Sequence, residues 1–365
     1  MKTVLLISPE AWGSSKVSKH HYALELSKRG NLVYFLNPDS ESFKYTKINK
    51  YLTVIDYKEK LRGLHYLPRF IQRQYFKYAI NRLEKSLKCE FDIIWNFDSS
   101  RFYELSLIKN KLKICHIVDM AEDMQRPLLS QTSDICFCTS DFIKEELIPY
   151  NSRVEKVHHG YQIPKEELHL AENFDSEKIQ VGYVGNLTRT CIDWELVQKL
   201  VQEHPNLQFN FIGGYSHSNL SRVAINNSIL DVLKNSTNVT LLGPKESILI
   251  PSYLQQFDVL LSVYKLENEA DIKQHSNLHK TMEYIGSGKV TVSTYSDEYK
   301  DKRELLEMVE EREQFFERFD KVVKDLVHYN SEEKQLARKE FVRDNTYSKQ
   351  LERIEGLLMK YQLLN

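Results

Sequence analysis

Short apolar runs that alternate with helical patterns are the feature that most limits how this chain can fold. Residues 4–8 and 32–36 are apolar and short, as buried strands are, and residues 20–29 have helical periodicity and end at Gly30. Such alternation favours parallel sheets joined by right-handed crossovers. The same patterns predict strands at 91–95, 113–118, 134–139, 179–185, 209–213, 239–243, 258–263 and 289–294, and helices at 141–147, with Ser140 as its N-cap, 194–203, 251–256, 278–285 and 347–364.

The alternation begins again after a polar stretch at residues 171–178, which indicates two domains. The length of 365 residues agrees, because a domain contains about 150 residues. We expect two Rossmann-like, doubly wound α/β domains that face a cleft, at residues 1–170 and 171–345, and a C-terminal helix at 346–365 that can cross back to the first domain. Ligands of such domains bind at the carboxyl ends of strands, so the loops after strands are where a site is expected.

Two classes of protein are disfavoured by the sequence. There is no run of about 18 apolar residues, so we expect no membrane-spanning helix. The apolar start is too short for a signal peptide, and Pro9-Glu10 follows it where small residues would mark a cleavage site. An odd and scattered set of cysteines predicts free thiols and a cytoplasmic protein: Cys89, Cys115, Cys136, Cys138 and Cys191.

The most informative segment begins at residue 275 and reads His-Ser-Asn-Leu-His-Lys-Thr-Met-Glu-Tyr. Ser276 or Asn277 is expected to cap a helix with Lys280 in its first turn, where free N–H groups and a cation favour a diphosphate. Glu283 lies near the same face, and its carboxylate can accept hydrogen bonds from ribose hydroxyls. The alternative is an ordinary capped helix with an exposed Lys–Glu pair.

This segment resembles the donor-binding segment of B-fold (GT-B) glycosyltransferases, in particular the group 1 or family 4-like enzymes of bacterial polysaccharide biosynthesis. The resemblance rests on Asn277, Lys280, Glu283, Tyr284, Gly286 and Gly288, although Asn277 stands one residue further from the lysine than in the family. It implies that Glu283 holds the donor ribose and that Ser276, Asn277 and Lys280 hold the diphosphate. Retaining members often have a sugar-contacting glutamate where His275 stands here, so retaining or inverting stereochemistry stays open.

Other loops are similar to the same family. Gly185 and Asn186 follow a predicted strand and permit close backbone approach, and Arg189 can clamp a diphosphate. Gly213 ends the next strand, and Lys245 stands where the family's base-contacting loop lies.

The first loop, residues 8–16, carries a further candidate contact. It is neither a dinucleotide fingerprint nor a P-loop. By resemblance, Gly13 and Ser15 would approach the donor phosphate or the acceptor, together with Ser14 and Lys16. A plain surface turn is the alternative.

A catalytic base is needed if the transfer inverts configuration, because the acceptor hydroxyl must then lose its proton. Asp119 directly follows a predicted strand, and Asp123 lies in the same loop. Asp119 is the preferred candidate, and His158 and Asp98 come second. The alternative is that both loop carboxylates only cap the next helix, and a retaining transfer would not use them as a base.

A basic segment lies between the second and third predicted strands. Residues 44–88 hold twelve Lys or Arg and three Asp or Glu, a net charge of +9, and residues 61–88 interleave aromatic residues with the cations. This pattern is typical of a helix on an anionic membrane surface, and equally of the solvated face of a packed helix. No recognition motif supports binding to nucleic acid.

We therefore expect a glycosyltransferase, specifically a hexosyltransferase, that moves a sugar from a nucleoside-diphosphate sugar to a glycan or lipid-linked acceptor in cell-surface polysaccharide synthesis. The donor is a substrate, and no cofactor is expected. No Asp-x-Asp motif stands at a strand end, so the transfer is expected to be independent of metal. Two alternatives remain: a nucleotide-sugar 2-epimerase of the same fold, and a non-catalytic subunit that binds sugar nucleotides or glycans.

Overall fold

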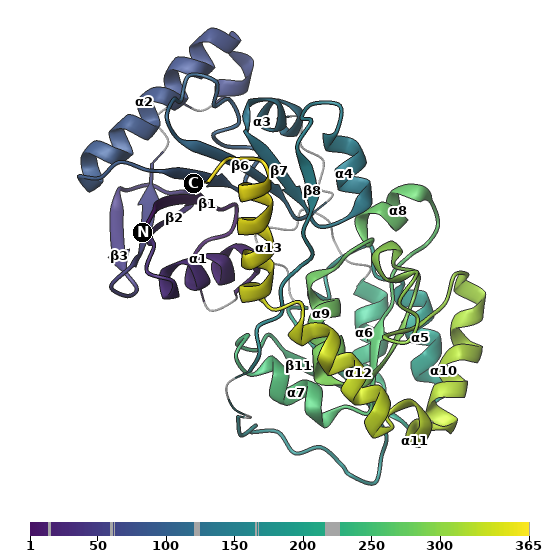
Figure 1. The fold of residues 1–365 in the computed structure, drawn as a ribbon. Helices are drawn as coiled ribbons and strands as arrows, with labels where there is room; N and C mark the ends of the chain where they lie inside the picture. Colours follow the sequence, from purple (N-terminus) through teal and green to yellow (C-terminus); the bar gives the residue numbers. More distant parts are fainter. Residues whose placement is uncertain are drawn as a thin grey trace. The chain divides into compact units, whose positions relative to one another are not determined.

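The structure, a computed structural model, describes residues 1–13, 16–58, 61, 63–119, 125–164, 166, 168–215 and 227–364 (Figure 1). It divides into two compact units. Unit 1 comprises Met1–Gly160 and Tyr347–Asn365, and unit 2 comprises Tyr161–Thr346.

Unit 1 is built on an eight-stranded sheet in the order β3-β4-β2-β1-β5-β6-β7-β8. Every neighbouring pair is parallel except β3 and β4, which are antiparallel. Its strands are β1 (Thr3–Ile7), β2 (Leu32–Asp39), β3 (Lys44–Lys47), β4 (Leu52–Tyr57), β5 (Ile93–Asn96), β6 (Leu112–Ile117), β7 (Ile135–Cys138) and β8 (Val154–Lys156), and its helices are α1 (Ser18–Lys28), α2 (Arg69–Leu87), α3 (Arg126–Thr132), α4 (Asp141–Leu147) and α13 (Tyr347–Lys360).

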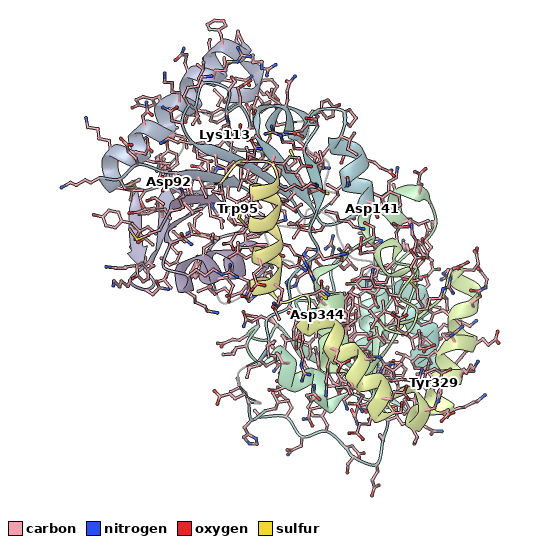
Figure 2. All side chains as sticks on the ribbon, viewed as in Figure 1. Asp92, Trp95, Lys113, Asp141, Tyr329 and Asp344 are labelled. Atoms are coloured by element: carbon pink, nitrogen blue, oxygen red, sulfur yellow. The ribbon has the colours of Figure 1, made fainter. Side chains whose placement is uncertain are left out.

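The sheet of unit 1 is covered on both faces, which is why β1 is apolar throughout. Leu5 and Ile7 point to the face that α2 covers, whereas Val4 and Leu6 point to the face that α1 and α13 cover (Figure 1). Trp95 of β5 lies in this second layer, beneath α13 (Figure 2). Parallel strands buried on both faces read as continuous apolar runs instead of alternating ones.

Unit 2 has a six-stranded parallel sheet in the order β11-β10-β9-β12-β13-β14. Its strands are β9 (Gln180–Val184), β10 (Gln208–Ile212), β11 (Val239–Gly243), β12 (Val259–Ser262), β13 (Val290–Ser293) and β14 (Glu307–Met308). Its helices are α5 (Trp194–Glu203), α6 (Asn227–Asn235), α7 (Ile250–Gln256), α8 (Glu269–Gln274), α9 (His279–Ser287), α10 (Phe315–Lys324), α11 (Leu326–Tyr329) and α12 (Glu332–Arg343). Two doubly wound α/β units are thus confirmed.

The chain passes into unit 2 after Gly160, whereas the sequence pattern placed the boundary after residue 170. Gly160 packs tightly in unit 1, because a Cβ there would lie 2.4 Å from the ring of Tyr347. Tyr161 packs against Gly286 of unit 2, and its N–H donates to the carbonyl of Asn345 at 2.8 Å. The polar stretch after residue 161 is therefore a surface segment of unit 2.

Several local predictions can be compared with the structure. Ser140 caps α4, accepting from the Ile143 N–H at 3.3 Å. The five cysteines are free thiols. Within the described part of the chain, no helix is both long enough and apolar enough to cross a membrane. Helix α8, which directly precedes α9, and the antiparallel β3–β4 pair were not predicted.

Candidate functional site

The sheet of unit 2 changes direction between β9 and β12. From β9 the chain continues to β10 on one side, and from β12 to β13 on the other. β12 pairs with β9 only at Val181 and Gly182, so the two strands are not paired at their carboxyl ends. Such a switch point is where open α/β sheets bind ligands.

Two glycine turns close one side of this switch point. A Cβ on Gly213 would lie 1.8 Å from the carbonyl oxygen of Gly185, so no other residue fits without moving the backbone. The Gly185 N–H donates to the Ile212 carbonyl at 2.9 Å, and the Leu187 N–H donates to the Gly214 carbonyl at 3.0 Å. The loops after β9 and β10 therefore lie in backbone contact at Gly185 and Gly213.

Helix α9 is fastened to the end of β9 by two side chains. The Tyr284 hydroxyl accepts from the Val184 N–H at 2.7 Å and lies 3.2 Å from its carbonyl oxygen. The Lys280 ammonium donates to the same carbonyl at 3.2 Å and lies 3.9 Å from the ring centroid of Tyr183 and 4.9 Å from that of Tyr264. A cation is thus held at the switch point by a carbonyl and aromatic rings.

Burial shifts the ionisation of the two predicted ligand-binding side chains on α9. Burial, together with the nearby positive charge of Arg189, lowers the pKa of Lys280 to about 7. Burial also raises the pKa of Glu283 to about 7, against the opposing effect of Lys280. Near neutral pH, these two groups can therefore change charge when a ligand arrives.

His275 lies beside the same cluster with its ring stacked on Tyr264, the centroids 4.5 Å apart. It is 1% exposed, and neither ring nitrogen has a hydrogen-bond partner among the described residues. Burial, followed by the positive charge of Arg189, lowers the pKa of His275 to about 4, so the imidazole is neutral. Buried polar atoms usually have partners, so these nitrogens are suited to a ligand.

The start of α9 differs from the prediction that Ser276 or Asn277 caps it. The helix begins at His279, and its N-cap residue, Leu278, has no side chain that could accept a capping hydrogen bond. Because α8 ends only at Gln274, residues 275–278 form a connecting loop, in which the Ser276 hydroxyl donates to the Lys273 carbonyl at 2.9 Å. The predicted N-cap position is therefore wrong, because Leu278 occupies it.

The remaining predicted ligand contacts of unit 2 lie in other loops, Asn186 and Arg189 after β9 and Lys245 after β11. The Asn186 side chain supports its own turn by accepting from the Thr188 N–H at 2.9 Å. Arg189 is exposed. Lys245 forms an ion pair with Glu172, which also accepts from the Tyr253 hydroxyl, so this lysine is engaged with the segment before β9.

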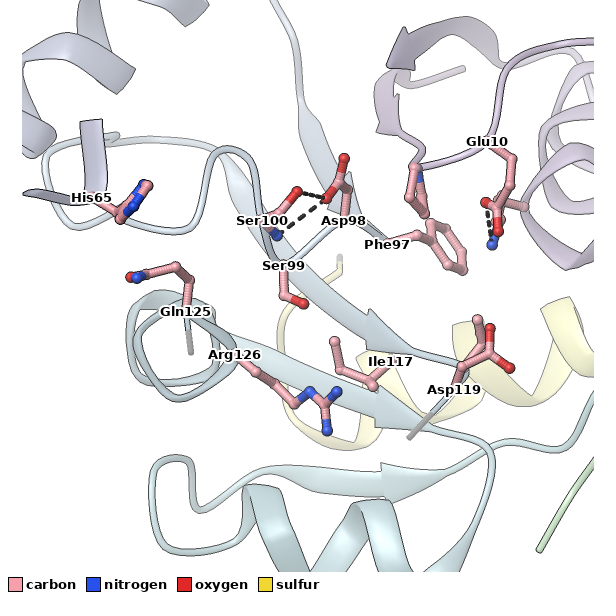
Figure 3. A pocket seen from close by; sticks show the side chains of 13 residues that line it. Glu10, His65, Phe97, Asp98, Ser99, Ser100, Ile117, Asp119, Gln125 and Arg126 are labelled. Atoms are coloured by element: carbon pink, nitrogen blue, oxygen red, sulfur yellow. Dashed lines mark hydrogen bonds and ion pairs between the residues drawn. The ribbon is translucent and has the colours of Figure 1, made fainter. Parts of the chain in front are cut away.

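Unit 1 has a cavity of about 560 Å³ at the corresponding place in its own sheet (Figure 3). The chain continues from β1 to one side and from β5 to the other, and residues after β1, β5 and β6 line the cavity. The lining consists of Pro9, Glu10, Lys19, His65, Phe97, Asp98, Ser99, Ser100, Ile117, Val118, Asp119, Gln125 and Arg126.

Ion pairs and hydrogen bonds organise this cavity. Lys19, only 2% exposed, lies 2.5 Å from the carboxylate of Glu10. Asp98 accepts from the Ser100 hydroxyl at 2.6 Å, as Figure 3 shows. Arg126 pairs with Glu146 on α4 at 2.5 Å.

Only some of the predicted catalytic residues line this cavity. Asp119 is exposed and lines the cavity with Asp98, whereas His158, half-buried after β8, is not among the lining residues. Gly13 is exposed in the turn after β1. Asp123 and Ser15 lie outside the described residues.

Sequence reasoning missed several residues of both sites. Glu10 and Tyr264 each stand two or three residues after a strand, so the rule of inspecting loops after strands could have found them. Lys19 lies inside a helix, and its sequence gives no sign that it is buried. Within the described ranges, no group of three or more His, Cys, Asp or Glu side chains could hold a metal ion.

This chain matches known proteins in a comparison of structures. No protein-family model and no curated protein matches the sequence. Sucrose-phosphate synthase from Thermosynechococcus elongatus superimposes with a TM-score of 0.73 at 14% identity, over 99% of this chain and 100% of that chain. HepE from Anabaena, in complex with UDP-glucose, gives 0.69 at 10% identity over 99% and 100%, and a glycosyltransferase from Rickettsia africae gives 0.67 at 12% over 99% and 98%.

These similar structures are GT-B glycosyltransferases. The chain has the GT-B fold. Unit 1 corresponds to the N-terminal domain of a GT-B protein, completed by the C-terminal helix, and unit 2 to the C-terminal domain. The cluster around α9 therefore lies in the C-terminal GT-B domain, and the 560 Å³ cavity lies in the N-terminal one.

Proposed function

We propose that this GT-B protein is a glycosyltransferase that takes its sugar from a nucleoside-diphosphate sugar. The observation that carries the proposal is the cluster at the switch point of unit 2, where Lys280 and Glu283 stand on α9 beside the glycine turns. UDP and UDP-glucose complexes of HepE, which shares the fold, support a donor of this class. No cofactor or metal is part of the proposal.

Each donor group has a proposed partner in unit 2. The diphosphate meets the first N–H groups of α9, Lys280 and Arg189, whose charges offset the charge that develops on the leaving group. Glu283 accepts hydrogen bonds from the ribose hydroxyls. The neutral imidazole of His275 contacts the transferred sugar, since its nitrogens have no other partner among the described residues.

The acceptor belongs to unit 1 in this proposal. We take it to be a glycan or lipid-linked saccharide of cell-surface polysaccharide synthesis that enters the 560 Å³ cavity. If the transfer inverts configuration, Asp119 is the preferred base, because it is exposed at the cavity wall and follows β6.

Thermal-shift binding tests the donor site. UDP, GDP, CMP and dTDP sugars are compared on the wild type, on Glu283→Ala and, as a control, on Glu203→Ala, which removes an exposed carboxylate of α5. A ligand at about one hundred times its Kd stabilises a protein by about 2.7 kcal/mol, so a true donor raises the melting temperature measurably. The rise should be lost only in Glu283→Ala. A rise that survives this change would contradict the assigned ribose contact, and no rise with any donor would favour a binding subunit.

Contact with the cytoplasmic face of a membrane is a further part of the proposal, supported by α2 and the turn before it. Phe70 is 66% exposed, Tyr78 52% and Tyr66 83%. Lys77 and Lys85 are exposed on the same helix as Phe70 and Tyr78. Aromatic rings beside cations suit the headgroup region of an anionic bilayer.

Flotation with anionic liposomes at low salt tests this contact. Each lysine near the surface contributes about 1 kcal/mol, so replacing Lys77 and Lys85 by Gln should weaken binding roughly thirtyfold. Lys109→Gln, at an exposed site elsewhere in unit 1, is the control. Wild-type protein that stays at the bottom of the gradient would rule the contact out.

A further inference from the structure

The cavity of unit 1 has the size and position of a small-molecule site. Its volume of about 560 Å³ falls within the range of about 300–1,000 Å³ that is typical of ligand pockets. The Phe97 ring and the hydroxyls of Ser99 and Ser100 lie in its wall together with the Asp98 and Asp119 carboxylates. An apolar ring among hydrogen-bonding groups suits a saccharide, whose faces are apolar and whose edge is a row of hydroxyls.

The cations of the cavity are already neutralised. Lys19 lies 2.5 Å from Glu10, and Arg126 lies 2.5 Å from Glu146. An anionic group entering the cavity would therefore meet cations whose charge a nearby carboxylate already offsets.

The remaining charges favour neutral ligands as well. Asp98 has Arg101 beside it at 3.7 Å, whereas Asp119 is exposed and forms no ion pair with any described residue. Among the described residues, the ionised groups of the lining and the ion pairs given above comprise four carboxylates, Glu10, Asp98, Asp119 and Glu146, against three cations, Lys19, Arg101 and Arg126. Like charges brought together without compensation weaken binding.

We infer that the acceptor entering this cavity is an uncharged saccharide, and that the cavity discriminates against sugar phosphates and uronic acids. The inference rests on the proposed function, because it takes the cavity to be the acceptor site. Its carboxylates accept hydrogen bonds from sugar hydroxyls, and the same carboxylates repel an added anion. The Glu10–Lys19 pair sets this preference, because it keeps the one buried ammonium of the lining away from the ligand.

Binding of acceptors without any donor tests the inference on the full chain. Methyl glycosides of glucose, galactose, mannose and N-acetylglucosamine are titrated beside their 6-phosphates and the methyl glucuronide, with saturation-transfer NMR and calorimetry as readouts. At least one neutral glycoside should bind on the order of tenfold more tightly than its charged counterpart, and the ratio should shrink at high salt, which screens charge.

Glu10→Gln is the decisive variant, because it releases the Lys19 ammonium without removing a lining side chain. The ratio of the affinity for the matching 6-phosphate to the affinity for the neutral glycoside should rise on the order of tenfold. Glu41→Gln, which removes an exposed carboxylate elsewhere in unit 1, should change neither. Asp119→Asn is a second test, at an exposed position. It removes one lining carboxylate and should reduce the ratio of the affinity for the neutral glycoside to the affinity for its 6-phosphate.

The outcomes separate this inference from the proposed function. A sugar phosphate that binds the wild type as tightly as its neutral counterpart overturns the inference. If nucleotide sugars bind and no saccharide does, the inference fails and the donor site stands. If neutral saccharides bind with the expected preference and no nucleotide sugar binds, the cavity chemistry is supported and the proposed transferase activity fails.

Discussion

Single residues in α9 and in the loop before it have pKa values that are shifted chiefly by burial. The pKa of Lys280 is lowered to about 7 and that of Glu283 raised to about 7, while His275 is held neutral with a pKa of about 4. Each shift disfavours the charged form, so the unliganded protein has a less stable site than neutral side chains would give it. A ligand with a diphosphate and ribose hydroxyls would supply the missing partners.

Glu283→Gln should therefore stabilise the unliganded protein at neutral and alkaline pH. The carboxyl has a higher pKa folded than unfolded, so its destabilising effect develops as pH rises from about 4.5 to about 7 and is complete above that. The melting temperature of the variant should exceed that of the wild type by a few degrees at pH 8, and the two should converge near pH 4.5. A difference that stays constant from pH 4.5 to 8 would contradict this account.

Gly213 and Gly214 are adjacent glycines with opposite surroundings. A Cβ at Gly213 would lie 1.8 Å from the Gly185 carbonyl, whereas a Cβ at Gly214 would meet no atom within 4 Å. We expect Gly213→Ala to destabilise unit 2 by about 1–3 kcal/mol, the usual cost of overpacking, and to abolish donor binding. Gly214→Ala is the matched control and should retain both, as measured by denaturant unfolding and thermal shift. If Gly213→Ala and Gly214→Ala changed stability and donor binding equally, the close approach of Gly213 to Gly185 would be unimportant.

At the scale of elements, α9 is joined to β9 where the sheet itself supplies no partner. Beyond Gly182, β12 no longer pairs with β9, and the Val184 N–H bonds to the Tyr284 hydroxyl instead. The helix thereby replaces a strand at the switch point. This arrangement positions Lys280 one turn before Tyr284, at the carboxyl end of β9.

Tyr284→Phe should destabilise unit 2 by about 1–3 kcal/mol, because it leaves the Val184 N–H without its partner. Tyr299→Phe is a close control, because the Tyr299 hydroxyl is equally buried but has no hydrogen-bond partner among the described residues. That second change should be neutral or slightly stabilising. Urea unfolding of both variants measures the free energy of unfolding. A similar decrease in both would refute the role of the Tyr284 hydroxyl.

The bounds of elements with strong periodicity could be predicted from the sequence. The contacts between side chains of different elements could not. Helices α4 and α5 have the predicted bounds, because each begins at a capping residue, Ser140 and Asp193. The loop at residues 275–278 was mistaken for a helix cap, since α8 is short and carries no clear period. Lys280 and Glu283 could be singled out by their spacing. The tyrosine rings around Lys280 come from β9 and the end of β12, and their convergence depends on tertiary structure.

At the scale of the whole molecule, unit 1 depends on a helix that is remote in sequence. Leu351, Ile354 and Leu358 of α13 are buried with Val4 and Leu26 in one cluster. Arg29 after α1 adds an ion pair to Glu355 at 2.7 Å and a hydrogen bond to the Ser348 carbonyl at 2.9 Å. The N-terminal domain of the fold is therefore discontinuous, while the C-terminal domain is continuous.

Ile354→Ala should weaken unit 1 selectively. A buried isoleucine reduced to alanine costs about 2–5 kcal/mol through lost burial and the cavity left behind. Hydrogen exchange should show faster opening of β1 and β5, with unchanged protection of β9 and β12 and unchanged donor binding. Met359→Ala, at an exposed site of the same helix, is the control. Loss of protection in both units would show that they unfold together.

The return of the chain to unit 1 at Tyr347 also has a consequence for how the protein is made. During synthesis all of unit 2 leaves the ribosome before Tyr347–Asn365, the segment that completes unit 1. Unit 2 therefore emerges before α13 does, and the apolar layer around Val4 and Leu26 stays incomplete until α13 emerges. The first domain to be translated is thus the last to be finished, and premature termination near the C-terminus would leave that layer exposed to chaperones and proteases.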